Sequence, residues 1–268
     1  MLNRMAFELG AHVDSVDPLA EAAAIGADIV QFFLGDPQSW KKPATLYPGG
    51  ADALKAAAEA AGVGLFIHSP YIINVASPNN RIRIPSRKIL QQTLDEAAAV
   101  GARGVVVHGG HVTAADDPEK GYENWRKCID GLTIEVPLLI ENTAGGNKAM
   151  ARYEESIARL WDAISGSPHI DQVGFCLDTC HAHAAGLELA GLAERITAIT
   201  GRIDLIHGND SRDAADSGRD RHANLGQGFA DGAAIVELVR TAGAPVILET
   251  PGGIEERLAD MAWLRDRL

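Results

Sequence analysis

The sequence predicts an α/β protein of the (β/α)₈ TIM barrel class, folded as a single domain over residues 1–268. Eight short apolar runs alternate with eight segments whose apolar residues recur at the helical period. Alternation of this kind implies parallel strands, and eight repeats favour a closed barrel over an open, doubly wound sheet. The length of 268 residues also suits one barrel domain.

The expected elements follow one another along the whole chain. Strands are expected near residues 5–11, 28–34, 64–68, 104–108, 137–141, 173–178, 203–208 and 245–249. Helices are expected near residues 17–25, 51–62, 86–101, 119–131, 151–165, 188–200, 231–242 and 254–267. Glycines such as Gly26, Gly62 and Gly243 follow helices, where a C-terminal cap is expected. The stretch 209–231 is too long for an ordinary loop of a barrel, so we expect it to be functional.

Composition limits the class of protein. The formal net charge is −12, which argues against loose, field-driven binding to nucleic acid, although bound divalent cations change the charge of a site. The three cysteines are an odd number and favour reduced thiols in the cytoplasm. The sequence shows no export signal and no apolar run of about 20 residues, so we expect a cytoplasmic protein without a membrane segment.

Six consecutive apolar runs each end in a side chain that can bind a metal. These side chains are His68, His108, Glu141, Asp178, His207 and Glu249. A single histidine at a strand end is more often a hydrogen-bonded rim residue, but independent accidents do not place acceptors at six strand ends in order. Because the carboxyl ends of barrel strands meet on one rim, the six side chains are expected to lie together.

Three further candidates belong to the same rim. His181 lies three residues after Asp178, and Asp220 and His222 lie in the long stretch 209–231. Imidazole and carboxylate together suit Zn²⁺ or Mn²⁺. Nine candidate ligands are too many for one tetrahedral ion, so two or three ions that share a bridging carboxylate are expected.

Five segments of the chain resemble the motifs of a known family, endonuclease IV, the metal-dependent apurinic/apyrimidinic endonucleases of base-excision repair. The segments are residues 68–74 (HSPYIIN), 141–145 (ENTAG), 176–181 (CLDTCH), 207–211 (HGNDS) and 220–226 (DRHANLG). The resemblance implies three zinc ions per chain, while the donor types also suit manganese. It also implies that His68, His108 and Glu141 hold the first ion, that Glu141 bridges to a second ion completed by Asp178, His207 and Glu249, and that His181, Asp220 and His222 hold the third.

The same resemblance implies a reaction and a partner. The enzyme is expected to hydrolyse the phosphodiester 5′ to an abasic site in duplex DNA, leaving a 3′-hydroxyl and a 5′-deoxyribose phosphate. A hydroxide shared between two ions would attack, with Glu141 as the catalytic bridging carboxylate. Removal of 3′ blocking groups is expected as well. Tyr71 and Ile72 match positions that enter the duplex, whereas Gln38 stands where the family commonly has an arginine. We expect a monomer, because wrapping a duplex needs an open face.

Two other functions remain open from the residues alone. A sugar isomerase or epimerase of a related barrel type also places Glu, Asp and His at strand ends, usually for one or two ions, and does not require the Asp220/His222 pair. A DNA-binding or metal-storing protein without turnover is the second, although the acidic charge disfavours DNA binding. A count of bound metal ions separates the first alternative from repair.

Overall fold

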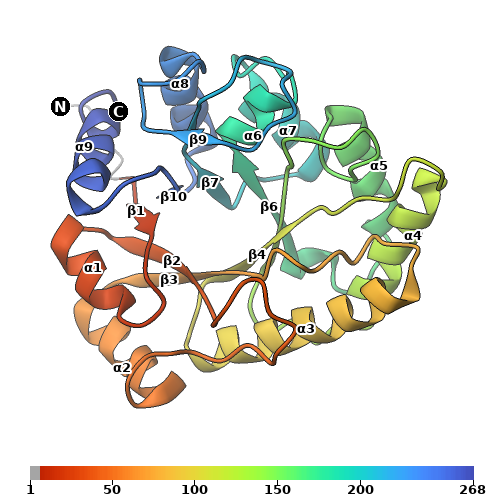
Figure 1. Ribbon diagram of the computed structural model, residues 1–268, viewed down its shortest axis with the longest axis horizontal. Coiled ribbons are helices and arrows are strands. Elements are labelled where there is room, and N and C mark those ends of the chain that lie inside the picture. The colour runs from red at the N-terminus through yellow and green to blue at the C-terminus, as the bar shows by residue number, and fades with distance from the viewer. Residues whose placement is uncertain (1–6) are drawn as a thin grey trace.

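Eight parallel strands close into a barrel in the computed structural model, which describes residues 7–268 (Figure 1). They are β1 (Leu9–His12), β2 (Ile29–Phe33), β3 (Gly64–His68), β4 (Gly104–His108), β5 (Leu138–Glu141), β6 (Val173–Asp178), β7 (Leu205–His207) and β10 (Val246–Leu248). The barrel closes because β1 pairs in parallel with both β10 and β2. The predicted fold is therefore confirmed. Since β1 near the start of the described residues pairs with β10 near their end, we propose that residues 1–268 form one domain.

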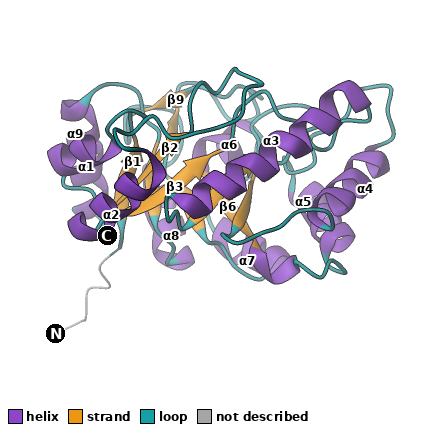
Figure 2. Ribbon diagram, turned by 90° about the horizontal axis from the view of Figure 1, so that it is seen from below, coloured by secondary structure: helices purple, strands orange, loops and turns teal. Residues whose placement is uncertain are grey.

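Helices surround the barrel on its outside (Figure 2). They are α1 (Pro18–Ile25), α2 (Gly50–Ala61), α3 (Asn80–Ala99), α4 (Pro118–Ile129), α5 (Glu154–Ile164), α6 (Thr179–Ala184), α7 (Leu192–Thr200), α8 (Gly232–Ala242) and α9 (Ile254–Arg265), with a 3₁₀ turn at Ile170–Gln172. None of the helices within residues 7–268 has the length and apolar character needed to cross a membrane.

The interior of the barrel is filled by one buried side chain from each of seven strands. These side chains are Ile29, Phe66, Val106, Leu139, Cys176, Leu205 and Ile247. The eighth strand contributes Gly10, which pairs with Ile29 and Ile247; a Cβ atom at Gly10 would lie 1.6 Å from the carbonyl oxygen of Ile29. A larger apolar cluster lies between strands and helices. The plugged interior leaves the carboxyl rim of the strands as the place for polar chemistry.

Several predicted boundaries were wrong, each for a local reason. Helix α3 begins at Asn80 instead of residue 86, because Pro85 lies inside the helix and does not end it. The Asn79 side chain caps this helix by accepting from the backbone N–H of Arg81. Strands β7 and β10 are shorter than predicted, so Glu249 lies one residue beyond its strand. Residues 5 and 6 of the first predicted strand lie outside the described residues.

Two features after β6 were not predicted. The short helix α6 follows β6 directly, and the predicted helix 188–200 begins only at Leu192. The long stretch 209–231 contains a two-stranded antiparallel sheet, β8 (Asp210–Ser211) and β9 (His222–Ala223). The buried Asp210 carboxylate organises this stretch by accepting the backbone N–H groups of Gly226, Gly228 and Ala230 at 2.9–3.1 Å.

Candidate metal centre

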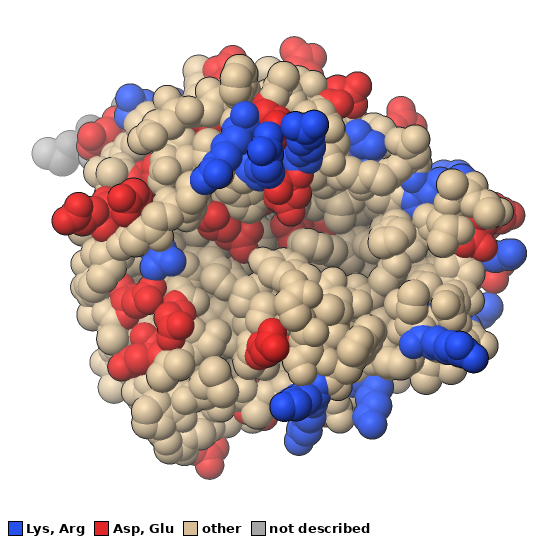
Figure 3. All heavy atoms as spheres, in the orientation of Figure 1, with Lys and Arg blue, Asp and Glu red and all other residues tan. Residues whose placement is uncertain are grey.

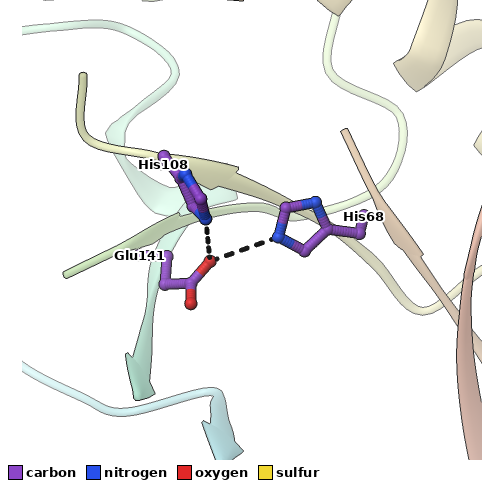
Figure 4. A group of neighbouring side chains, drawn as sticks. All are labelled: His68, His108 and Glu141. Carbon is purple, nitrogen blue, oxygen red and sulfur yellow. Dashed lines mark ion pairs between the residues drawn. The ribbon is translucent and has the colours of Figure 1, made fainter. Parts of the chain in front are cut away.

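The first three candidate ligands converge from neighbouring strand ends (Figure 4). His68, His108 and Glu141 are the last residues of β3, β4 and β5. The Nε2 atoms of His68 and His108 lie 3.4 and 3.3 Å from Oε2 of Glu141. That oxygen is buried and accepts no hydrogen bond from any described residue. Three ligand atoms therefore point at one another without bonding, which leaves room for a cation between them.

The second group shares Glu141 with the first. His207 Nδ1 lies 3.0 Å from Oε1 of Glu141, 3.3 Å from Oε2 of Glu249 and 3.9 Å from Oδ2 of Asp178. Glu141 thus turns one carboxylate oxygen to each group. The carboxylate is fully buried, so its two oxygens face these neighbours and not solvent.

The third group joins the barrel rim to the long stretch 209–231. Asp220 Oδ1 lies 3.1 Å from Nε2 of His181 and 3.0 Å from Nε2 of His222. Both imidazole nitrogens are buried without a hydrogen-bond partner among residues 7–268. The structure therefore brings Asp220 and His222 of the long stretch to His181, on the rim where they were expected.

The donor sets fit divalent cations. In each of the three groups the possible ligand atoms all lie within 4.8 Å of one another. Buried polar atoms without partners are costly, and the unpartnered Glu141 Oε2, His181 Nε2 and His222 Nε2 would be satisfied by cations. A mixed imidazole and carboxylate set is typical of zinc. Asp178, Cys180 and His222 form a further overlapping group, but burial raises the pKa of the Cys180 thiol to about 12, which disfavours thiolate ligation.

Three of the histidines are fixed through their other ring nitrogen. Nδ1 of His68 lies 2.7 Å from the Ser69 carbonyl oxygen, Nδ1 of His181 lies 2.9 Å from that of Asn142, and Nδ1 of His222 lies 3.0 Å from that of Glu249. A carbonyl oxygen only accepts, so each Nδ1 carries the hydrogen and donates. Each Nε2 therefore faces its group as a lone pair when the ring is neutral.

Mutual charge controls the ionisation of these side chains. Burial by itself raises the pKa of Glu141, but the imidazoles of His207 and His108 outweigh burial and hold that pKa well below its usual range. Burial likewise opposes ionisation of His222, yet the Asp220 and Asp178 carboxylates raise its pKa to about 9. Without cations the centre therefore binds protons, which metal ions must displace.

Sequence reasoning missed the amide side chains that hold the carboxylates. Asn209 donates from Nδ2 to Oδ2 of Asp178 at 2.7 Å and accepts the backbone N–H of Glu249 at 2.8 Å. Asn142 exchanges two hydrogen bonds with the Asp178 backbone. Gln31 is fully buried between His207 and Glu249. The available signals were the positions of Asn142 and Asn209 close to candidate ligands in the sequence, and a glutamine inside the apolar run 29–33.

The residues expected to contact DNA differ in how close they lie to the three groups, whose opening at the carboxyl rim of the barrel we call the mouth. The Tyr71 ring is half exposed and lies 5.2 Å from the His68 ring and 5.8 Å from the His108 ring, between centroids. Tyr71 and Ile72 line a cavity of about 230 Å³ together with His108. Gln38 is exposed in the loop between β2 and α2, where its backbone N–H donates to the Asp36 side chain, and no hydrogen bond joins it to the described residues of the three groups.

Charges of both signs gather on this face (Figure 3). Lys and Arg side chains lie beside acidic side chains at the hollow of the molecule. In the long stretch, Arg221 Nε donates to Oδ2 of Asp213 at 2.7 Å, and Arg219 lies 3.4 Å from Oδ1 of the same carboxylate. The Arg221 hydrogen bond lowers the pKa of Asp213 and outweighs the opposing effect of burial. One carboxylate therefore fixes two guanidinium groups near the mouth.

Comparison with known proteins identifies the family. A family model described as "Xylose isomerase-like TIM barrel" matches residues 19–267. A curated Mycobacterium leprae protein described as a probable endonuclease 4 is 57% identical over 97% of this chain and 98% of its own length. The chain belongs to the endonuclease IV family. The resemblance seen in the five sequence motifs is thereby confirmed, and the chain is placed among nucleases of the hydrolase class.

Solved structures agree with membership of the endonuclease IV family. The crystal structure of endonuclease IV from Thermus thermophilus superposes with a TM-score of 0.83 at 31% identity, covering 97% of this chain and 98% of that one. A D-tagatose 3-epimerase-like protein superposes with a TM-score of 0.75, but it is only 17% identical and therefore shares the fold alone.

Proposed function

We propose that this chain is a zinc-dependent endonuclease that hydrolyses the phosphodiester 5′ to an abasic site in duplex DNA. The products would be a 3′-hydroxyl and a 5′-deoxyribose phosphate, and removal of 3′ blocking groups belongs to the same proposal. The observation that carries it is the arrangement of three ligand groups around one mouth, two of them sharing the Glu141 carboxylate. We propose a monomer that works in the cytoplasm.

The nine ligands would be divided among three ions as the three groups are divided. His68, His108 and Glu141 would hold the first ion; Glu141, Asp178, His207 and Glu249 the second; and His181, Asp220 and His222 the third. When bound, such ions supply an activated water and positive charge for the phosphate oxygens. Zinc is favoured by the mixed donors, and manganese is the alternative.

The protein itself supplies fixed charge and position. The buried Glu141 carboxylate remains ionised and turns one oxygen to each of two groups, so it holds their spacing. Tyr71 stays protonated because burial, together with the Glu249 and Glu141 carboxylates, raises the pKa of its phenol. Its exposed ring is therefore available as an uncharged surface against which a base or sugar can pack.

Binding of DNA must overcome the acidic charge of the chain. Three divalent ions would take the formal charge from −12 to −6. Arg219 and Arg221, fixed by Asp213, are positioned to contact phosphates beside the mouth. Because only a few cations take part, we expect a shallow dependence of binding on salt, with a slope of about −0.9 for each phosphate contact.

A nicking assay tests the proposed function. Zinc-loaded protein is mixed with a labelled duplex that carries one stable abasic analogue, and the products are sized beside an undamaged duplex of the same sequence. Cleavage is expected only at the 5′ side of the lesion and should disappear after prolonged chelation. An intact abasic duplex after incubation with fully metallated protein would refute the proposal.

A further inference from the structure

We propose that Gln31 is a positioning residue for the second of the three metal groups, called the middle group from here on, which consists of Glu141, Asp178, His207 and Glu249. Its amide orients the two ligands His207 and Glu249. The inference rests on the proposed function, since it concerns one of the three ions of that proposal. Gln31 is on β2, far along the chain from both ligands, and its side chain is fully buried. We do not count it as a ligand, because its amide is fully engaged by protein partners.

Every polar atom of the Gln31 amide has a partner. Nε2 lies 2.6 Å from Oε1 of Glu249 and 3.1 Å from Nδ1 of His12. Oε1 lies 2.9 Å from Nε2 of His207. An amide offers two N–H donors on nitrogen, so this arrangement satisfies both of them and leaves the oxygen for His207.

The direction of these hydrogen bonds follows from the chemistry of Glu249. A carboxylate that holds a metal is ionised, and an ionised carboxylate only accepts. The nitrogen of Gln31 must therefore face Glu249, and its oxygen must face His207. The oxygen accepts, so His207 donates from Nε2. Nδ1 of His207 is thereby the nitrogen turned to Glu141, Asp178 and Glu249.

His207 differs in this respect from three other candidate ligands. His68, His181 and His222 are anchored by Nδ1 on backbone carbonyls and face their groups with Nε2. His207 is anchored by Nε2 on a side chain and faces its group with Nδ1. Substitution cannot remove a backbone carbonyl, but it can remove the Gln31 amide. The affinity of the middle group for metal should therefore depend on a residue outside the ligand set.

The test uses two variants of Gln31. Gln31→Met keeps the length of the side chain but loses all three hydrogen bonds. Gln31→Glu keeps an acceptor for His207 and places a second carboxylate against Glu249. Loss of a residue that orients metal ligands typically weakens metal affinity by about 10- to 100-fold. We expect competition with a chromophoric chelator to show one of three zinc ions bound about 10- to 100-fold more weakly in both variants.

The matched control is Gln91→Met. Gln91 donates to the Thr133 carbonyl oxygen at 3.0 Å and to Asp95 on α3, away from the mouth, so this variant loses side-chain hydrogen bonds without touching the centre. Its three ions should keep wild-type affinity. Three ions of unchanged affinity in Gln31→Met would overturn the inference.

A measurement on the unaltered protein covers the case in which Gln31→Met does not fold. Long-range ¹⁵N–¹H spectra of the zinc-loaded chain report which nitrogen of each histidine carries hydrogen. We expect hydrogen on Nε2 of His207, and hydrogen on its Nδ1 instead would overturn the inference. If the wild-type chain binds fewer than three zinc ions or leaves abasic DNA intact, the proposed function fails; if it meets both conditions and Gln31→Met binds like wild type, the inference alone fails.

Discussion

Asp178 accepts the backbone N–H of His181 at 2.6 Å, so the last residue of β6 is also the N-cap of helix α6. One carboxylate thereby sets the position of a second candidate ligand three residues later. Its other oxygen is turned to Asn209 and to the middle group. The local motif CLDTCH is therefore a structural unit in which the helix cap and a candidate metal ligand are the same side chain.

This double role predicts a graded response at position 178. Asn caps a helix about as well as Asp, so Asp178→Asn should keep the fold while it weakens metal binding through the lost charge. Asp178→Ala should in addition lose about 1 kcal/mol of stability with the cap. Urea unfolding of the metal-free variants, beside zinc competition, separates the two effects. Equal stability of the Asn and Ala variants would contradict the capping role.

Glu141→Gln should abolish turnover and leave the barrel intact. The substitution removes the charge between the first two groups. Loss of a residue that only orients metal ligands already costs about 10- to 100-fold in metal affinity or activity, so loss of this charge should slow nicking by more than about 100-fold. Glu123→Gln, on the exposed face of α4, is the control and should nick at the wild-type rate. Wild-type turnover of Glu141→Gln would exclude the bridging role.

Tyr71→Ala should weaken binding to abasic duplex more than Gln38→Ala. Stacking of an aromatic side chain contributes about 1–3 kcal/mol per base, which corresponds to roughly 5- to 150-fold in affinity. Tyr71 lies at the mouth beside His68 and His108, whereas Gln38 is exposed in the loop between β2 and α2. Fluorescence anisotropy in the absence of turnover measures both affinities. Equal losses would place the main duplex contact elsewhere.

The thiols should be inert near neutral pH. Burial raises the pKa of Cys128, Cys176 and Cys180 to about 12 in each case, and only the thiolate reacts readily. A coloured disulfide reagent should therefore react with no cysteine of the native chain and with three after denaturation. Rapid reaction of any one thiol in the folded protein would show that its surroundings are more open than the structure describes.

The ion pair at the foot of the barrel predicts a pH effect. Arg103 donates two hydrogen bonds of 2.7 Å to Glu8, and these bonds lower the pKa of that carboxyl. A lowered pKa in the folded state stabilises the protein above the ordinary Glu value, and this stability is lost as the pH falls through the lowered value. Because both side chains are about two-fifths exposed, Glu8→Gln should cost only about 0.5 kcal/mol at neutral pH. The difference in unfolding free energy between the two proteins should shrink as the pH falls through that lowered pKa; a difference that stays constant with pH would contradict this.

The sequence was sufficient for the barrel and for the nine rim residues, because period and strand ends are local signals. Their division into three groups came from the resemblance to endonuclease IV alone, because it depends on register and on side-chain direction, which local patterns do not give. Glu141 reaches two groups because its neighbours His108 and Cys176 in the sheet place it between β4 and β6. The role of Gln31 could not be predicted from the sequence, because this residue lies within an apolar run far along the chain from His207 and Glu249. The sheet β8–β9 could not be predicted from the sequence, because each strand is only two residues long. The Asp210 carboxylate holds the stretch after it by accepting the backbone N–H groups of Gly226 and Gly228.

The proposed function requires three ions that act together in one nuclease centre. Titration of the metal-free chain with zinc, with nicking of an abasic duplex followed at each addition, tests it most directly. We expect nicking to rise until three equivalents of zinc are bound per chain and then to stay constant. Full activity at one equivalent, with no further change at three, would contradict it.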